Sequence, residues 1–453
     1  MITKLQTFSA PYIAETQRLV RLSEEQETAA FVRTRNSGAE DGAVDIVFCG
    51  PAVIHEGRYF QDRPTEWIKQ YHAMLERAML VPLAGYFAYE FGYQFEESRW
   101  NELPIANGQV MFRFAELPYW YEADHKARVG RICIAPGTTH NGIQNSLLQK
   151  FCAFIECASP RLFQSGNDRS SSNNLAASKV AMQMSPGQGN GCWDRDEAGY
   201  IHTVEHILED IRDGRYYEIN FTQRYSATSS AAPPHVFSAL VESLSPDYAA
   251  YFKFADEHVI SASPELFLRK TGQTVQTCPI KGSFVGSVSG SEWEKLKAEH
   301  IMVVDLARND LGRICNSGWV RVEEQCYVRK FGRLSHLESR IAGDTTHTAG
   351  EILRSTLPAA SITGMPKVIT VQAIANYERS PRGLYTGNCG ILWPDGGFQL
   401  NVAIRTMRAE TSADGCGWRY TLGAGGAIVA DSDPEQEYRE CVAKAEPLIR
   451  HLQ

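Results

Sequence analysis

The sequence predicts an α+β fold. Segments with the helical spacing of apolar residues are separated by segments that alternate as strands do, and several strand-like segments follow one another with only short turns between them. Strands joined by short turns pair antiparallel. We therefore expect antiparallel sheets combined with helices.

The elements after residue 195 carry the clearest patterns. Residues 196–213 have apolar side chains at 200, 201, 204, 207, 208 and 211, which is helical spacing, and Gly214 follows as a stop signal. Residues 216–227, YYEINFTQRYSA, alternate as a strand does, and residues 251–284 indicate successive strands, one of which ends near Lys281. Further helices are predicted at 291–307, 349–356, 366–377 and after Asp433, and further strands at 385–393, 398–408 and 417–429.

A stretch rich in Ser, Asn and Gly divides the chain. Residues 159–194 are poor in large apolar side chains, which predicts a flexible linker. It separates an N-terminal part, residues 1–158, from a C-terminal part, residues 195–453.

Composition narrows the class of protein. The 453 residues include 45 Lys plus Arg against 53 Asp plus Glu, a net charge of −8, with no basic block that would follow a phosphate backbone, so nucleic acid is not an expected partner. The 11 cysteines form no C-x-x-C pair, which fits a reducing cytosol. The longest apolar run, 78–89, is interrupted by Pro82 and Gly85. We expect a cytoplasmic protein without a membrane span.

One glutamate lies on the apolar face of a predicted helix. The helix begins at Ser291, with Glu294 at the capping-box position. Glu299 shares its face with Leu296 and Val303. A carboxylate buried there costs several kcal/mol unless it is paired or binds a metal. A rim position or a salt bridge is the alternative interpretation.

The last predicted helix carries two more acidic residues on one face. Pro434 suits its first turn, and Glu437 and Glu440 are three residues apart. Like charges at this spacing repel, and a divalent cation would reverse the effect. A solvated acidic face is the alternative, but together with Glu299 these residues are candidates for an oxygen-lined Mg²⁺ site.

Two further features suggest ligand binding. The glycine-rich run 423–432, GAGGAIVADS, leads into a helix, where a nest of backbone N–H groups would bind carboxylates or phosphates. Lys281 follows a strand-like run and precedes Gly282, and burial would favour its neutral, nucleophilic form. Glu265 ends another strand-like segment and would supply a proton.

Together these segments resemble the chorismate-utilising enzymes, the family of anthranilate, isochorismate and aminodeoxychorismate synthases. A weaker likeness, PLAGYFAYEFGYQFE at 82–96, extends into the N-terminal part. The resemblance implies a four-layer α/β/β/α fold with two large, mostly antiparallel sheets packed together and helices outside. The segments that carry it, in the family's order, are EHIMVVDLARNDLGRIC, LSHLESRI, SITGMPK, YTGNCGIL, NVAIRTM and GAGGAIVADSDPEQEYRE.

Within this family Lys281 separates the activities. At this position anthranilate synthases usually carry alanine, and aminodeoxychorismate synthases carry lysine. Asn220 also resembles the aminodeoxychorismate version. The resemblance thus implies that chorismate and ammonia are converted to 4-amino-4-deoxychorismate, for 4-aminobenzoate and folate synthesis. Lys281 would attack C2 of the ring while Glu265, as general acid, protonates the leaving 4-hydroxyl.

The resemblance also implies how the substrate is held. Its ring carboxylate would bind Mg²⁺ held by Glu299 and Glu440, with Glu437 nearby. Tyr385 and Arg405 would hold the enolpyruvyl carboxylate. The remaining substrate-binding groups would be Gly282, Ser283, His336, Gly425, Gly426 and Ala427.

The sequence departs from the family pattern at four positions. Ser283 stands where threonine is usual, Met365 replaces a small residue, and Leu296 stands where relatives often have an acid. Ala427 replaces a usual glycine, which would strain the backbone if that position required positive φ.

The ammonia is expected to come from a separate glutamine amidotransferase subunit. GNCGI at 387–391 departs at Ile391 from the G-x-C-x-G pattern of a glutaminase nucleophile. Three alternatives remain: anthranilate synthase component I, isochorismate synthase and a catalytically inactive regulatory subunit. Lys281 and Asn220 argue against the first, and retention of Lys281, Glu265 and the three glutamates argues against the last.

Overall fold

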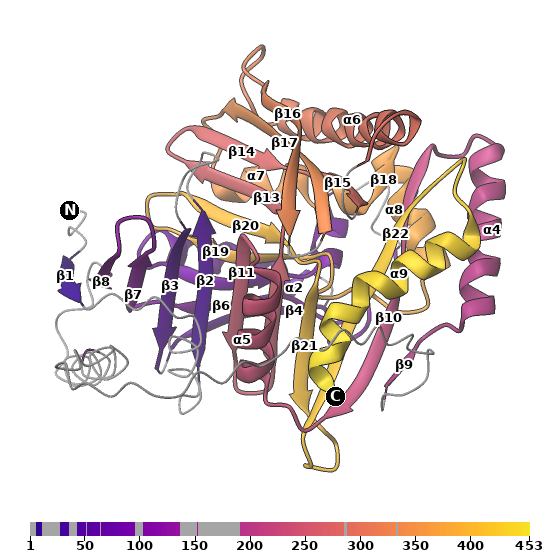
Figure 1. Cartoon of the computed structure of the whole chain (residues 1–453). Coiled ribbons are helices and arrows are strands. Elements are labelled where there is room, and N and C mark those ends of the chain that lie inside the picture. The colour runs from indigo at the N-terminus through magenta and orange to yellow at the C-terminus, as the bar shows by residue number, and fades with distance from the viewer. Residues whose placement is uncertain are drawn as a thin grey trace, which may run out of the picture.

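Two large sheets form the body of the molecule (Figure 1). The computed structural model describes residues 6–10, 28–35, 43–50, 52–63, 65–95, 103–135, 152, 191–284, 288–331 and 334–453. The twelve-stranded sheet has the order β1 (Gln6–Ala10), β8 (Val129–Ile134), β7 (Tyr119–Asp124), β3 (Ala43–Cys49), β2 (Ala29–Arg35), β11 (Tyr248–Lys253), β12 (His258–Ser263), β21 (Thr406–Thr411), β22 (Trp418–Val429), β10 (Glu218–Ser229) and β18 (Gly364–Met365), with β9 (Gly191–Trp193) paired to β10.

The second sheet is built in the same way. It has ten strands, in the order β15 (Ile280–Phe284), β17 (Leu334–Asp344), β14 (Thr274–Cys278), β13 (Leu266–Thr271), β20 (Phe398–Val402), β19 (Asn388–Leu392), β5 (Leu83–Phe87), β6 (Val110–Glu116) and β4 (Ile54–Arg58), with β16 (Arg321–Phe331) paired to β17. Neighbouring strands in both sheets pair antiparallel. The predicted antiparallel α+β class is therefore confirmed.

Helices cover the sheets from outside, which confirms the four-layer arrangement. α6 (Ser291–Gly312) packs on β15 and β17, whereas α5 (Pro233–Leu244), α4 (Glu197–Arg212) and α9 (Pro434–Ile449) pack on the twelve-stranded sheet (Figure 1). The remaining α-helices among the described residues are α2 (Glu66–Ala78), α7 (Ala349–Thr356) and α8 (Lys367–Tyr377). One contiguous apolar core includes side chains of both sheets. None of the described helices has the length and apolar character needed to cross a membrane.

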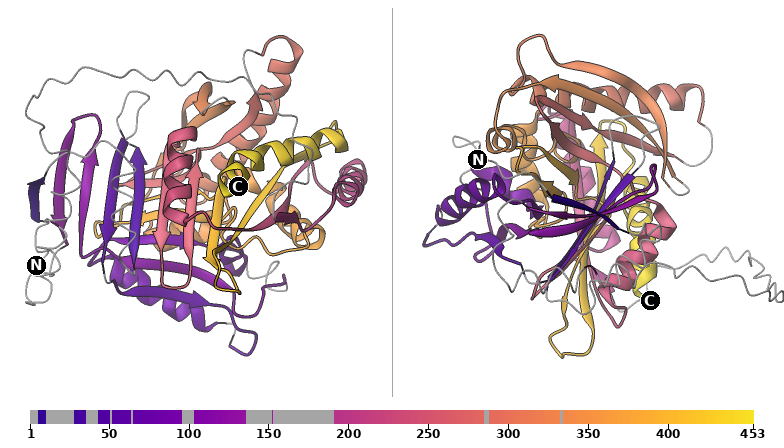
Figure 2. Two further views of the ribbon diagram at one scale, coloured as in Figure 1. Left: turned by 60° about the horizontal axis from the view of Figure 1, so that its bottom comes forward. Right: turned by 90° about the vertical axis from the view of Figure 1, so that its left-hand side faces the viewer.

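Both parts of the chain contribute strands to both sheets. β2 pairs with β11 in the twelve-stranded sheet, and β5 pairs with β19 in the ten-stranded sheet. The left view of Figure 2 shows the indigo and purple strands continuing side by side into the magenta ones. Of the predicted linker, 159–194, all but the last four residues lie outside the described residues, and Gly191–Trp193 form β9.

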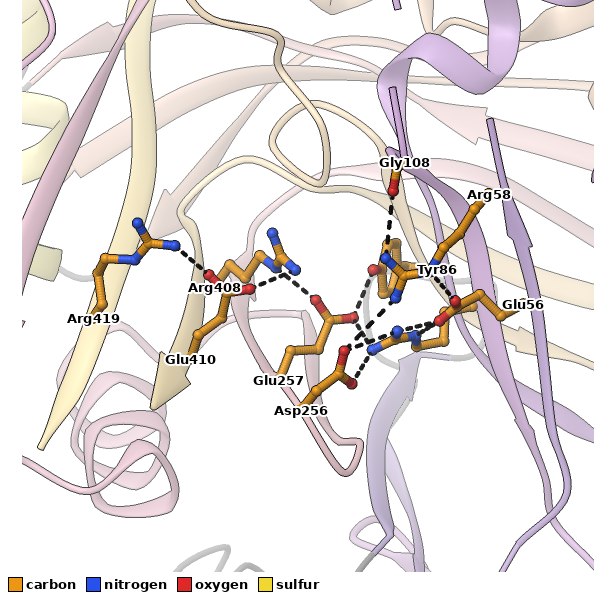
Figure 3. A network of polar contacts seen from close by, with 10 residues as sticks. Glu56, Arg58, Tyr86, Gly108, Asp256, Glu257, Arg408, Glu410 and Arg419 are labelled. Atoms are coloured by element: carbon orange, nitrogen blue, oxygen red, sulfur yellow. Dashed lines mark hydrogen bonds and ion pairs between the residues drawn. The ribbon is translucent and has the colours of Figure 1, made fainter. Parts of the chain in front are cut away.

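An ion-pair network with the buried Arg113 and Glu257 at its centre joins the two sheets (Figure 3). Arg113 of β6 reaches across to Asp256 at 2.6 Å and to Glu257 at 3.0 Å, both in the turn before β12. Glu257 also accepts hydrogen bonds from Tyr86 of β5 and Arg408 of β21, each at 2.6 Å. The network fixes the sheets relative to each other at this edge.

Two local predictions are wrong. Ser291 and Glu294 form no capping box, because Gly290 with φ of 67° is the N-cap of α6 and no side chain caps it. The single strand predicted at 398–408 is two strands, β20 and β21, which belong to different sheets. The chain crosses between the sheets at 403–405, where Arg405 has φ of 50°. The alternation of side chains that is typical of strands does not reveal such a crossing, because it continues before and after residues 403–405.

Candidate active site

A cavity of about 410 Å³ lies between α6, α9 and the ends of both sheets. Every predicted site residue lines it except Ser283, whose side chain lies outside the described part; its backbone pairs with that of His336. The lining residues predicted from sequence are Glu265, Lys281, Gly282, Glu299, His336, Tyr385, Arg405, Gly425, Gly426, Ala427, Glu437 and Glu440. The sequence motifs thus converge on one place in the fold.

A bulge in β15 places the Lys281 side chain. The register of β15 against β17 shifts between Lys281 and Ser283, and Gly282 between them has φ of +64°. A Cβ at Gly282 would also approach Leu296 Cδ2 to 3.0 Å. Positive φ at a bulge favours glycine, and bulges redirect neighbouring side chains. Gly282 is therefore needed for the backbone, whatever its role toward substrate.

The amine of Lys281 is held by an acid that the sequence analysis missed. Lys281 Nζ lies 2.6 Å from Glu218 Oε1, and the two side chains are only 12% and 4% exposed. Glu218 and Asn220 are two residues apart on β10, so they share a face of the strand. Asn220 lines the cavity, so this spacing places Glu218 near the site, but it does not indicate the contact with Lys281, which is 63 residues away.

Glu265 has the environment of a general acid. It is 3% exposed, between β12 and β13, and the Ser361 hydroxyl donates a hydrogen bond of 2.5 Å to its Oε1. Burial raises the pKa of Glu265 to about 8, although the hydrogen bond from Ser361 and the charge of Lys281 act in the opposite direction. At neutral pH the carboxyl therefore holds a proton that it can donate. Ser361 is a second residue that the sequence analysis missed.

Arg405 and His336 meet across the two sheets. Arg405 Nη2 lies 3.3 Å from His336 Nε2. Burial lowers the pKa of His336 to about 3, helped by the charges of Arg405 and Lys444, so the imidazole is neutral and accepts the hydrogen bond. Burial also lowers the pKa of Arg405 to about 10, which leaves the guanidinium charged at neutral pH. The pair presents a positive charge to the cavity.

The glycine-rich run is a strand and not a nest. Gly423 to Ala427 belong to β22, paired with β10, and none of them has positive φ. Ala427 is thus unstrained. Glycine is needed for close approach, because a Cβ at Gly425 would lie 2.0 Å from the Phe221 carbonyl oxygen and one at Gly423 would meet the Tyr385 ring at 2.2 Å.

The three predicted metal ligands line the same cavity, Glu299 from α6 and Glu437 and Glu440 from α9, and they influence one another. Burial raises the pKa of Glu437 to about 7, and the charges of Glu440 and Glu299 add to this effect. Burial likewise raises the pKa of Glu299. Glu440 differs, since Lys444 at 2.6 Å lowers its pKa. Lys444 was not predicted from the sequence.

The carboxylate oxygens of these three residues are the type of ligand that a hard cation prefers. Mg²⁺ takes oxygen ligands, and a divalent ion would offset both the burial that raises the pKa of Glu437 and the repulsion from Glu440 and Glu299 that adds to it. Among the described residues no three His, Cys, Asp or Glu side chains already converge in ligand geometry. Glu440 would therefore have to exchange the ammonium of Lys444 for the ion.

The fold is that of the chorismate-utilising enzymes. Residues 29–450 match the family described as chorismate binding enzyme, and the chain belongs to this family. Among solved structures, the menaquinone-specific isochorismate synthase from Escherichia coli aligns over 100% of this chain and 95% of its own, with a TM-score of 0.68 and 16% identity. This likeness shows the shared fold.

Sequence relatives include two different synthases. Aminodeoxychorismate synthase component 1 of Bacillus subtilis (strain 168) is 34% identical over 269 residues, which cover 57% of this chain and 56% of the relative. Anthranilate synthase component 1 of Saccharolobus solfataricus is 34% identical over 261 residues, which cover 55% and 61%. The match spans little more than half the length of these relatives. Their equal identity does not separate the two activities.

Proposed function

We propose that the protein is an aminodeoxychorismate synthase component 1, which converts chorismate and ammonia to 4-amino-4-deoxychorismate. The observation that carries this proposal is the buried amine of Lys281 at the wall of the cavity, in the family position where anthranilate synthases usually have alanine. An amine in this place supplies a nucleophile for the ring.

Two residues would perform the first half of the reaction. Lys281 Nζ attacks C2 of chorismate, the ring double bond shifts, and the C4–O bond breaks. Glu265 gives its proton to the departing hydroxyl. It can do so because burial raises its pKa to about 8, so the carboxyl is protonated at neutral pH. Ammonia then adds at C4 and expels Lys281, and Glu265 takes back a proton from the new amine.

The remaining residues would bind and orient the substrate. Mg²⁺, held by Glu299, Glu437 and Glu440, would neutralise the ring carboxylate. Arg405, oriented by the neutral His336, and the Tyr385 hydroxyl would hold the enolpyruvyl carboxylate. Gly282, Ser283, Gly425, Gly426 and Ala427 would leave room for the substrate to approach the backbone.

The ammonia would be supplied by a separate glutamine amidotransferase subunit, with free ammonium as a substitute. The product would feed 4-aminobenzoate and folate synthesis after a lyase removes pyruvate. Anthranilate synthase component 1 is the second candidate, because a relative with that name is equally similar.

Product identity tests the proposal. The purified chain is incubated with chorismate, Mg²⁺ and ammonium, beside Lys281→Ala, and products are separated by chromatography with and without an added aminodeoxychorismate lyase. We expect 4-aminobenzoate only when the lyase is present and a large loss of turnover in the variant. Fluorescent anthranilate formed without the lyase would instead establish the second candidate.

A further inference from the structure

Glu218 lies next to the amine of Lys281. It does not line the cavity, yet its Oε1 is 2.6 Å from Lys281 Nζ, and its whole residue is 3% exposed. β10 holds the glutamate, and the bulge of β15 holds the lysine. The two groups come from different sheets.

The chemistry of Lys281 requires a group of this kind. An ammonium has no lone pair, so Lys281 must lose a proton before it attacks carbon and regain one when it leaves. Other charged groups act on the amine: Glu265 from the β12–β13 connection, Glu299 and His300 from α6, and Glu440 from α9. Glu265 already holds a proton, and the amine is hydrogen-bonded to Glu218 alone among the acids of the described residues.

We propose that Glu218 is a further catalytic residue, the base that takes a proton from Lys281 and later returns it. This inference rests on the proposed function. The proton passes from Nζ to Glu218 Oε1, and the neutral amine forms the N–C2 bond while the C4–O bond breaks. When ammonia has added at C4, the N–C2 bond breaks, the amine leaves with its electron pair, and Glu218 returns the proton. The sum is chorismate plus ammonia to aminodeoxychorismate plus water.

Rapid quenching in the absence of ammonia tests this step. Enzyme is mixed with chorismate and Mg²⁺, stopped at intervals, and analysed by peptide mass spectrometry for an adduct on Lys281 with the mass of chorismate less one water. We expect Glu218→Gln to slow adduct formation by ~10²-fold or more, the ordinary contribution of a general base. If Glu218 were only a counter-ion, its loss would favour the neutral amine and speed adduct formation. An unchanged or faster rate therefore overturns the inference.

Two further variants secure the interpretation. Glu218→Asp keeps the carboxylate, and we expect it to restore much of the rate; a fully slow Glu218→Asp that binds chorismate normally would count against a proton-transfer role. Glu218→Gln combined with Lys281→Ala should lose no more turnover than Lys281→Ala alone, because Glu218 acts only through the amine. An additive loss would show that it acts elsewhere.

The two proposals fail in different ways. Wild-type enzyme that makes anthranilate, or makes no product from chorismate and ammonium, overturns the proposed function and the inference with it. Wild-type enzyme that makes aminodeoxychorismate while Glu218→Gln keeps the wild-type rate overturns the inference alone.

Discussion

Two buried carboxylates in this fold have opposite charge states, and their surroundings explain why. Asp45, on β3 in the N-terminal part, is 0% exposed. Arg33 donates to both of its oxygens, at 2.7 and 2.8 Å, and His125 lies 2.8 Å away. Burial would raise the pKa of Asp45, but the charge and hydrogen bonds of Arg33 outweigh it and hold this pKa below its ordinary value of 3.8.

Glu265, at the cavity, is 3% exposed and accepts hydrogen bonds from the Ser361 hydroxyl and from the Ile280 backbone. The nearby cation, Lys281, is hydrogen-bonded to Glu218 instead. Burial therefore prevails, and the carboxyl keeps its proton to a pH of about 8. A bidentate arginine keeps the buried Asp45 ionised, whereas uncharged donors, a hydroxyl and a backbone N–H, leave the buried Glu265 neutral.

Glu265→Gln should produce the largest effect on catalysis. The amide keeps the shape but cannot donate an acidic proton to the leaving hydroxyl, so we expect kcat/KM to fall by roughly 10²- to 10⁴-fold. The folded state loses no ion pair at this position. Urea unfolding should consequently give a free energy of unfolding within about 1 kcal/mol of wild type at pH 7. A variant that unfolds readily would show that Glu265 is structural, as Asp45 is.

Arg33→Met should have the opposite pattern of effects, a large loss of stability and little change in activity. It leaves Asp45 buried without its bidentate partner, and breaking a buried pair from one side typically costs about 3–5 kcal/mol. We expect the free energy of unfolding to fall by this amount, while turnover per folded molecule stays near wild type. Asp45→Asn is the matched control from the other side of the pair. If Arg33→Met lowered turnover of fully folded enzyme, the two regions would be coupled.

The two acids should also give opposite pH signatures. The raised pKa of Glu265 means that the folded state binds its proton more tightly, so its contribution to stability is present below pH 4.5 and is lost as pH rises to about 8. The stability of wild type relative to Glu265→Gln should decline over this window. Relative to Asp45→Asn, the stability of wild type should instead decline as pH falls below 3.8. Urea titrations between pH 3 and 9 test both signs.

The activity of the enzyme should also depend on the protonation of Glu265. Above pH of about 8 wild-type kcat/KM should fall as Glu265 ionises, and the residual activity of Glu265→Gln should lack this alkaline limb. A limb of equal position in both enzymes would assign it to another group.

Much of the cavity was predictable because its residues lie in local motifs. Lys281 and Gly282 are adjacent, and Glu437 and Glu440 share one helix face, so sequence patterns describe their immediate geometry. The structure brings these residues together at one cavity.

The partners that tune these residues were not predictable in the same way. Glu218 is 63 residues from Lys281, and Ser361 is 96 residues from Glu265. Such pairs depend on which strands become neighbours. The periodicity of a local sequence predicts a strand but does not predict its place in the sheet. The crossing at Arg405 was missed for the same reason, since alternation continues from β20 into β21.

Ser361→Ala should have the smallest effect on activity. It tests whether the hydroxyl at Glu265 favours the ionised carboxylate, as the arginine does at Asp45. The hydroxyl lowers the pKa of Glu265, so its removal should raise this pKa further and move the alkaline limb of kcat/KM to higher pH. A hydrogen bond contributes about 0.5–1.5 kcal/mol, which corresponds to about one pKa unit at most. Ser361→Thr keeps the hydroxyl and should leave the limb in place. Movement of the limb to lower pH in Ser361→Ala would mean that the hydroxyl stabilises the protonated acid, and the hydroxyl at Glu265 would then work against ionisation, opposite to the arginine at Asp45.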